Sequence, residues 1–170
     1  MFEVLVFVYE NYWHGASCPE PAYLQQKLSA VGFDAEEIEA ALIWLHDLRL
    51  AARDQSAPIT RVSTGDGGAA AAKTQAYDQS PHSLRVYTTA EQHHLGAPCL
   101  GFVSFLESAG ALSTSMREIV LERAMAAPAN PLALDDFKII VLMVFWSLGL
   151  EPDALILDEL CDDGAHRVAH

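Results

Sequence analysis

The chain has 170 residues and a formal net charge of −13, and 51% of its residues are hydrophobic. This length allows one full hydrophobic core, and this composition excludes disorder of the whole chain. The negative charge is concentrated in the two ends of the chain. Residues 1–52 hold 8 acids and 2 bases, residues 53–96 hold 4 of each, and residues 97–170 hold 11 acids and 4 bases. Because nucleic acids and anionic membranes attract Lys and Arg, the acidity disfavours both and favours a partner protein with a basic surface.

Cysteine usage and the start of the chain indicate a cytoplasmic protein. Cys18, Cys99 and Cys161 are too few and too scattered for a disulfide framework, and the first three residues lack the basic flank of a signal peptide. The strongest apolar run, 139–146, is far shorter than the roughly 20 residues of a membrane span. We therefore expect that run to form a buried helix.

Two helices are expected at the start of the chain. Gly15 ends the first, whose apolar residues recur at helical spacing: Phe2, Leu5, Val6, Tyr9, Tyr12 and Trp13. Pro19 and Pro21 suit the first turn of the second, which stops at Gly32.

A third helix over residues 34–51 is predicted to be amphipathic with an acidic outer surface. Asp34 would cap it, and Glu37 would complete a capping box. Its apolar stripe consists of Ile38, Ala41, Leu42, Leu45 and Leu48. Four acids cover the remaining surface and are the candidate partner-binding residues: Glu36, Glu37, Glu39 and Asp47.

The middle of the chain is predicted to be a loop between two short strands. From residue 53 to residue 82 the helical pattern is lost, around a Gly/Ala-rich insert at about 64–80 that we expect to be flexible. On either side, residues 59–63 and 84–88 alternate as strands do, and we expect them to pair as a β-hairpin.

The second half of the chain is predicted to be helical. Thr88 and Glu91 form a capping box for a helix that ends by Gly96, and another helix follows over residues 98–109. These two helices are separated only by the glycine.

Three more helices complete the second half. Ser113 or Ser115 would cap one of them, and Asp135 or Asp136 would start the next, which runs to about Gly149. That helix is apolar on all sides, so we place it at the centre of the core. The last helix carries Leu155, Ile156, Leu157 and Leu160.

The predicted fold is thus all-α, mainly helical with one short β-hairpin. Residues 1–96 would form a winged-helix-like unit of three helices with the hairpin and the insert. Residues 97–170 would form a helical bundle around the buried hydrophobic helix. We expect the two units to make one compact domain.

The sequence resembles the Smg protein family of bacteria over nearly its whole length. The first half matches at Met1-Phe2-Glu3-Val4-Leu5, Gly32-Phe33, Ala41-Leu42, Trp44-Leu45, Arg85-Val86-Tyr87-Thr88 and Glu91. The second half matches at Cys99, Gly101-Phe102, Phe105-Leu106-Glu107, Arg117-Glu118, Glu122-Arg123, Leu134-Asp135-Asp136, Lys138 and Leu142-Met143-Val144. The chain departs from the family in the Gly/Ala-rich stretch around 64–76 and in the Cys161-Asp162-Asp163 tail.

The resemblance implies a helical cytoplasmic protein without an established activity, so it transfers no functional residue to this chain. Genes of the family often lie near those for a DNA-processing protein and topoisomerase I. By association only, the resemblance therefore also implies a context in DNA metabolism.

Direct nucleic-acid binding is an alternative that the predicted topology invites. Three helices followed by two strands is the order of a winged helix-turn-helix, in which helix 34–51 would enter a DNA groove. A groove-reading helix needs Arg, Lys, Asn or Gln, whereas this one carries four acids. What stays open is a weak backbone contact through the bases of the hairpin and loop, which are Arg53, Arg61, Lys73 and Arg85.

A small metal- or thiol-dependent enzyme is the other alternative. His93, His94 and Cys99 carry atoms that could bind zinc, and Cys99 could be a nucleophile. No C-x-x-C or H-x-x-x-H spacing forces convergence, and an acidic chain offers no visible activating environment. The near P-loop at 67–74 lacks its second glycine and the flanking strand and helix, so it is interpreted as a linker.

The leading hypothesis is a non-enzymatic binding or regulatory protein whose acidic surface binds a basic patch on another protein. Its contacts would be Glu36, Glu37, Glu39 and Asp47. We expect no metal, cofactor or membrane contact. The sequence leaves the oligomeric state and the partner open.

Overall fold

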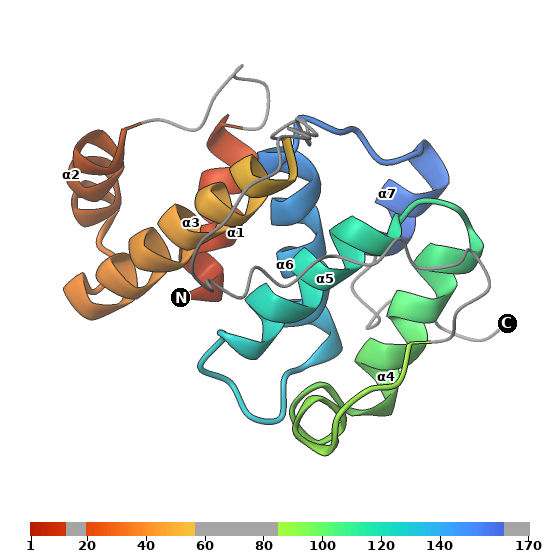
Figure 1. Ribbon diagram of the computed structural model, residues 1–170. Helices are drawn as coiled ribbons and strands as arrows, with labels where there is room; N and C mark the ends of the chain where they lie inside the picture. The colour runs from red at the N-terminus through yellow and green to blue at the C-terminus, as the bar shows by residue number, and fades with distance from the viewer. Residues whose placement is uncertain (13–19, 57–84, 162–170) are drawn as a thin grey trace, which may run out of the picture.

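The computed structural model describes residues 1–12, 20–56 and 85–161. Within these ranges the chain forms seven helices, labelled in Figure 1: α1 (Phe2–Tyr12), α2 (Pro21–Val31), α3 (Ala35–Ser56), α4 (Thr89–Ser108), α5 (Thr114–Met125), α6 (Leu134–Ser147) and α7 (Ala154–Cys161). No strand occurs in the part of the chain that is described. None of these helices combines the length and the apolar content that a bilayer span requires.

The predicted β-hairpin is wrong. Residues 85–88 precede α4 without regular secondary structure, and residues 59–63 lie outside the described ranges. The alternation that predicted a strand has another cause: the Arg85 guanidinium bonds acidic side chains and lies 4.9 Å from the Tyr87 ring centroid, while Val86 is 87% exposed. Within the described residues, the three N-terminal helices are therefore not followed by the β-hairpin of a winged helix. The mainly helical class holds.

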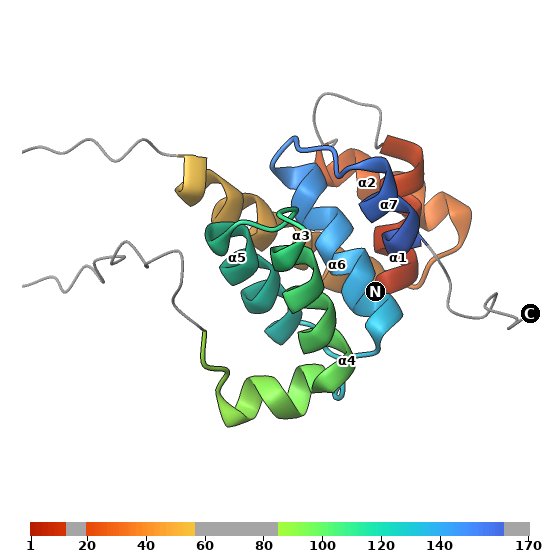
Figure 2. The same ribbon diagram turned by 90° about the vertical axis from the view of Figure 1, so that its right-hand side faces the viewer.

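Helix α6 lies at the centre of the molecule, as predicted. It packs against α1, α3, α4, α5 and α7, and both views show it between them (Figures 1 and 2). Phe137, Ile140, Val141, Met143 and Val144 have no exposed side-chain surface. The start of the helix differs from the prediction, because its N-cap is Ala133. Its two aspartates lie in the first turn instead, where negative charge still suits the helix dipole.

The N-terminal helices pack beside α6: α1 and α3 contact it, and α2 packs on α3 as the outermost of the three (Figure 1). Helix α1 buries Val4, Leu5 and Val8, so only Leu5 belongs to the face predicted for it. Helix α3 buries the predicted stripe, with Trp44 added and Leu42 only half-buried. The buried face is easier to predict for α3 than for the shorter α1, because more helical turns repeat its apolar stripe.

Helix α4 consists of two segments that meet at Gly96, as predicted. Gly96 has φ 66° and ψ 172°, a conformation that glycine adopts readily, and Pro98 follows at the start of the second segment. Thr88 and Glu91 form the expected capping box: the Thr88 hydroxyl accepts from the Glu91 amide at 3.2 Å, and the Glu91 carboxylate accepts from the Thr88 amide at 2.7 Å. Ser113 caps α5 by accepting from the amide of Met116.

Candidate functional site

The four acids predicted to bind a partner lie on α3, and the structure divides them into two pairs. Glu36 and Glu39 are exposed to solvent. Glu37 and Asp47 each form an ion pair within the molecule. The first pair is therefore free to meet another protein, while the second pair already has charged neighbours.

Glu37 joins α3 to the start of α1. Its Oε1 accepts a hydrogen bond from the amino group of Met1 at 3.0 Å. This contact explains why the predicted capping box is incomplete: Asp34 still accepts from the Glu36 amide at 3.4 Å, but the Glu37 carboxylate lies with Met1. Glu37 therefore has a structural contact with a residue that is distant in the sequence.

Asp47 faces α5 rather than solvent alone. Its Oδ2 lies 3.5 Å from Nη1 of Arg123, whose side chain is only 9% exposed and also pairs with Glu122 at 2.9 Å. One turn earlier on α3, the indole N–H of Trp44 donates to the carbonyl of Arg123 at 3.1 Å. These contacts hold α3 against α5, so Asp47 contributes to packing.

Two exposed apolar side chains lie beside the free acids. Ile43 is 57% exposed and Leu50 is 48% exposed. They are seven residues apart, so they share one side of the helix, opposite the stripe that includes Ile38, Ala41 and Leu48. We call this surface the α3 outer face; it consists of Glu36, Glu39, Ile43, His46 and Leu50.

The sequence prediction had overlooked Ile43 and Leu50. Both are visible in the sequence as large apolar residues at helical positions that face away from the stripe. Isolated exposed hydrophobics are common, but two on one face next to two free carboxylates are a more informative combination.

Cys99, the cysteine of the alternative enzyme hypothesis, is held in a structural contact. Cys99 is 1% exposed, and its thiol donates to the carbonyl of Leu132 at 3.6 Å. Burial raises the pKa of the Cys99 thiol to about 11, with a smaller contribution from the charge of Asp136. A nucleophilic cysteine needs the opposite shift, so this environment disfavours thiol catalysis.

The two histidines do not share one environment. His93 is exposed, whereas His94 is 8% exposed and its Nε2 lies 2.9 Å from the carbonyl oxygen of Ala124. Among the described residues, no three His, Cys, Asp or Glu side chains are grouped as metal ligands would be. His93 is therefore a surface residue and His94 a buried one.

Arg85 belongs to a charged cluster between α4 and α5, which we call the Arg85 cluster: Arg85, Glu91, Glu107, Arg117 and Glu118. Its Nη2 donates to Glu91 at 2.7 Å, and its Nε donates to Glu118 at 2.9 Å. The hydrogen bond from Arg85 lowers the pKa of Glu91 to about 2, and the same bond is the main cause of a raised pKa for Arg85.

This cluster bears on the nucleic-acid alternative. A guanidinium held by two carboxylates is a poor phosphate ligand, because binding would have to replace both ion pairs. Of the other bases considered, Arg53 is exposed at the end of α3, and Arg61 and Lys73 lie outside the described residues. The described part of the chain thus offers little support for a backbone contact.

The lowered pKa of Glu91 makes a pH-dependent contribution to stability. Because its folded-state pKa of about 2 lies below the ordinary value of 4.5, the contribution is complete above pH 4.5 and is lost as the pH falls toward 2. We expect Glu91→Gln to reduce the stability difference between pH 6 and pH 3, which urea unfolding at the two pH values measures. An unchanged difference in the variant would contradict this role of the Arg85–Glu91 pair.

In the part of the chain that is described, the fold and the site define a helical protein with an acidic and partly apolar helix face. The whole chain, residues 1–170, matches the family model described as "Protein of unknown function (DUF494)". It is 56% identical over 170 residues to the "Protein Smg homolog" of Methylibium petroleiphilum and 53% identical over 170 residues to that of Leptothrix cholodnii, each alignment covering 100% of both chains. The "Protein Smg homolog" of Bordetella pertussis is 39% identical over 174 residues, again with 100% of both chains covered.

The chain therefore belongs to the Smg protein family, whose function is unknown. No solved structure matches it.

Proposed function

We propose that this chain is a non-enzymatic binding or regulatory protein, and that its α3 outer face binds a basic segment of another protein. The observation that carries the proposal is the exposure of Ile43 and Leu50 beside Glu36 and Glu39 on one side of α3. The family's gene context adds DNA metabolism as the process, so basic proteins that act on DNA are the first partners to test.

Interface energetics support this choice of surface. Binding energy concentrates in a few central apolar or aromatic side chains, while charged groups around them direct association and specificity. On the α3 outer face, Ile43 and Leu50 can supply the apolar centre and the two glutamates the charged surroundings. The chain's net charge of −13 would accelerate encounter with a basic partner and make it sensitive to salt.

Affinity capture with the full chain tests the proposal. We expect the wild-type protein to retain a basic protein from cell extract, and roughly 0.5 M salt to release it, because such salt screens surface charges beyond a few ångströms. Once that protein is purified, its Kd should rise about tenfold for Glu36→Lys/Glu39→Lys and about tenfold for Ile43→Ala/Leu50→Ala.

A matched control separates the surface from the total charge. Glu10→Lys/Glu151→Lys makes the same change in net charge at exposed positions away from the α3 outer face, and it should leave the Kd within about twofold. If both charge variants weaken binding equally, only the overall charge matters. The α3 outer face would then lose its assignment.

A further inference from the structure

The α3 outer face extends by one more exposed residue toward the end of the helix. Arg53 follows Leu50 by three residues, lies in the last turn of α3 and is exposed. With Arg53 included, the exposed residues are three or four positions apart, so they form one continuous row along the helix. We call this row the α3 seam: Glu36, Glu39, Ile43, His46, Leu50 and Arg53. Such a row packs lengthwise on another helix at a crossing angle of about 20°.

The two ends of the α3 seam carry opposite charges. Glu36 and Glu39 lie at its N-terminal end, and Arg53 lies at its C-terminal end. Between them, Ile43 is 57% exposed and Leu50 is 48% exposed. A second copy of the seam in antiparallel orientation presents its base to these acids, whereas a parallel copy would place like charges opposite each other. The seam is therefore complementary to itself, as an interface of two identical surfaces about a twofold axis requires.

One antiparallel register gives every member of the α3 seam a counterpart. In this register the twofold axis passes midway between Ile43 and His46, and a shift of one heptad in either direction leaves two members of each seam unopposed. The opposed pairs are Glu36 with Arg53, Glu39 with Leu50, and Ile43 with His46. Because three residues of helix rise only about 4.5 Å, Arg53 of the second copy also lies near Glu39. One guanidinium can therefore pair with either carboxylate.

We propose that the α3 seam binds the α3 seam of a second copy of this chain in antiparallel orientation. The inference rests on the proposed function for its choice of surface, and it adds a competitor: the second copy covers the residues that a basic partner needs. The seam is about 26 Å long, so the contact is smaller than a standard interface of roughly 800 Å² per partner. The dimer is accordingly weak, with a Kd on the order of 10–100 µM.

Sedimentation equilibrium of the full chain alone tests the dimer. We expect the weight-average mass to rise with concentration from that of one chain toward that of two. Each copy has a net charge of −13, so the copies repel each other at a distance. Raising the salt from about 10 mM to about 150 mM shortens the Debye length from about 30 Å to about 8 Å, which screens this repulsion more than the contacts within the seam. The dimer Kd should therefore fall, whereas the Kd for a basic partner should rise.

Charge reversal tests the register. Glu36→Arg and Arg53→Glu should each raise the dimer Kd about tenfold, because each places like charges opposite each other twice in the dimer. The double variant exchanges the two charges, and its Kd should lie within about threefold of the wild type. Total charge cannot explain a loss in both single variants, since Glu36→Arg makes the chain less negative and Arg53→Glu makes it more negative. Glu10→Arg, at an exposed position of α1, is the control for Glu36→Arg and should not raise the Kd.

Thermal unfolding by circular dichroism establishes that each variant is folded before its Kd is interpreted. A chain that sediments as a monomer up to about 1 mM overturns the inference. So does a dimer whose Kd is unchanged in both single variants, or a folded double variant that associates no better than they do. A monomeric chain that still retains a basic protein would overturn the dimer and leave the proposed function intact. A dimer with these charge effects that retains no other protein would do the reverse.

Discussion

Replacing Phe137 by alanine is expected to lower the free energy of unfolding by about 3–5 kcal/mol, because it removes a large side chain and leaves a cavity in the core. Phe137 is 0% exposed and meets the Phe102 ring edge-on, with a centroid distance of 6.5 Å and an interplanar angle of 84°. It lies on α6, which packs against five other helices. No single neighbour can move to fill the space without leaving other contacts.

Urea unfolding monitored by circular dichroism measures this loss. Phe105→Ala is the matched control, because it removes the same side chain from a position that is 44% exposed, and it should cost about 1 kcal/mol or less. Equal losses in the two variants would contradict the central position of α6.

The parts of the fold that the sequence predicted correctly are those with a local physical cause. The capping residues Thr88, Glu91 and Ser113 satisfy amides within their own helices, so their function does not depend on the rest of the molecule. The apolar run of α6 also predicts its own position, because a helix that is apolar on all sides has to be buried among other helices. Gly96 ends a helical segment through its own backbone conformation.

The errors arose where distant residues decide the outcome. The pattern at 84–88 predicted a strand, but residues 85–88 form none, and the Arg85 side chain bonds Glu118 on α5. Glu37 was expected to cap its own helix, and it pairs with Met1 instead. Local pattern cannot distinguish these cases, because each alternative satisfies the same side chain and differs only in its partner.

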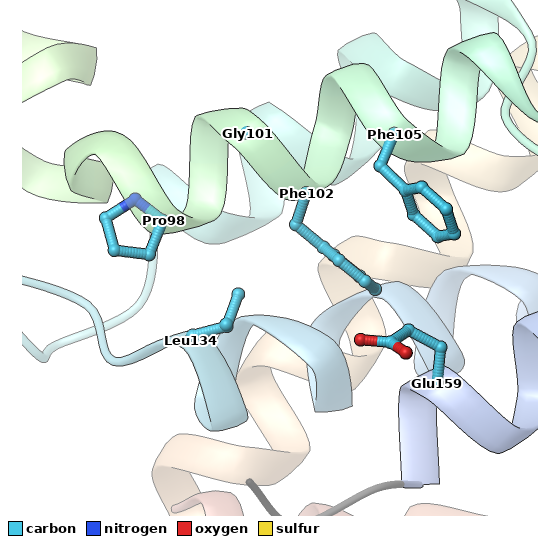
Figure 3. A pocket seen from close by; sticks show the side chains of 6 residues that line it. All are labelled: Pro98, Gly101, Phe102, Phe105, Leu134 and Glu159. Atoms are coloured by element: carbon cyan, nitrogen blue, oxygen red, sulfur yellow. The ribbon is translucent and has the colours of Figure 1, made fainter. Parts of the chain in front are cut away.

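The candidate surfaces were also predictable only where their features are local in the sequence. The acids of α3 could be located from the sequence, because charge and helical spacing are local properties. The sequence could not show which of these acids are free of ion pairs, because Asp47 pairs with Arg123 only when α3 packs on α5. A shallow groove was not predicted at all, because its walls come from α4, α6 and α7 (Figure 3): it is lined by Pro98, Gly101, Phe102, Phe105, Leu134 and Glu159. A glycine in a helical pattern without an obvious turn was its only signal in the sequence.

Removing the carboxylate of Glu118 is expected to destabilise the protein by about 2–4 kcal/mol, because two poorly exposed guanidinium groups depend on it. Glu118 accepts from Nε of Arg85 at 2.9 Å and from Nε of Arg117 at 3.0 Å. Arg117 is only 5% exposed and Arg85 is 20% exposed. Glu91 and Glu107 remain as partners in Glu118→Ala, which keeps the loss below that of a fully orphaned buried charge.

A control variant and a compensating second substitution test whether the two guanidinium groups cause the loss of stability. Glu151→Ala removes an exposed carboxylate with the same change in net charge and should cost about 0.5 kcal/mol or less. If the weakened pairing of these cations causes the loss, adding Arg85→Met to Glu118→Ala should recover part of it in urea unfolding, since the double variant removes a guanidinium that has lost one of its two carboxylate partners. An additive further loss would mean instead that Arg85 stabilises the protein through its contact with the Tyr87 ring and its bond to Glu91. The attachment of residues 85–88 to α5 would then not depend on Glu118.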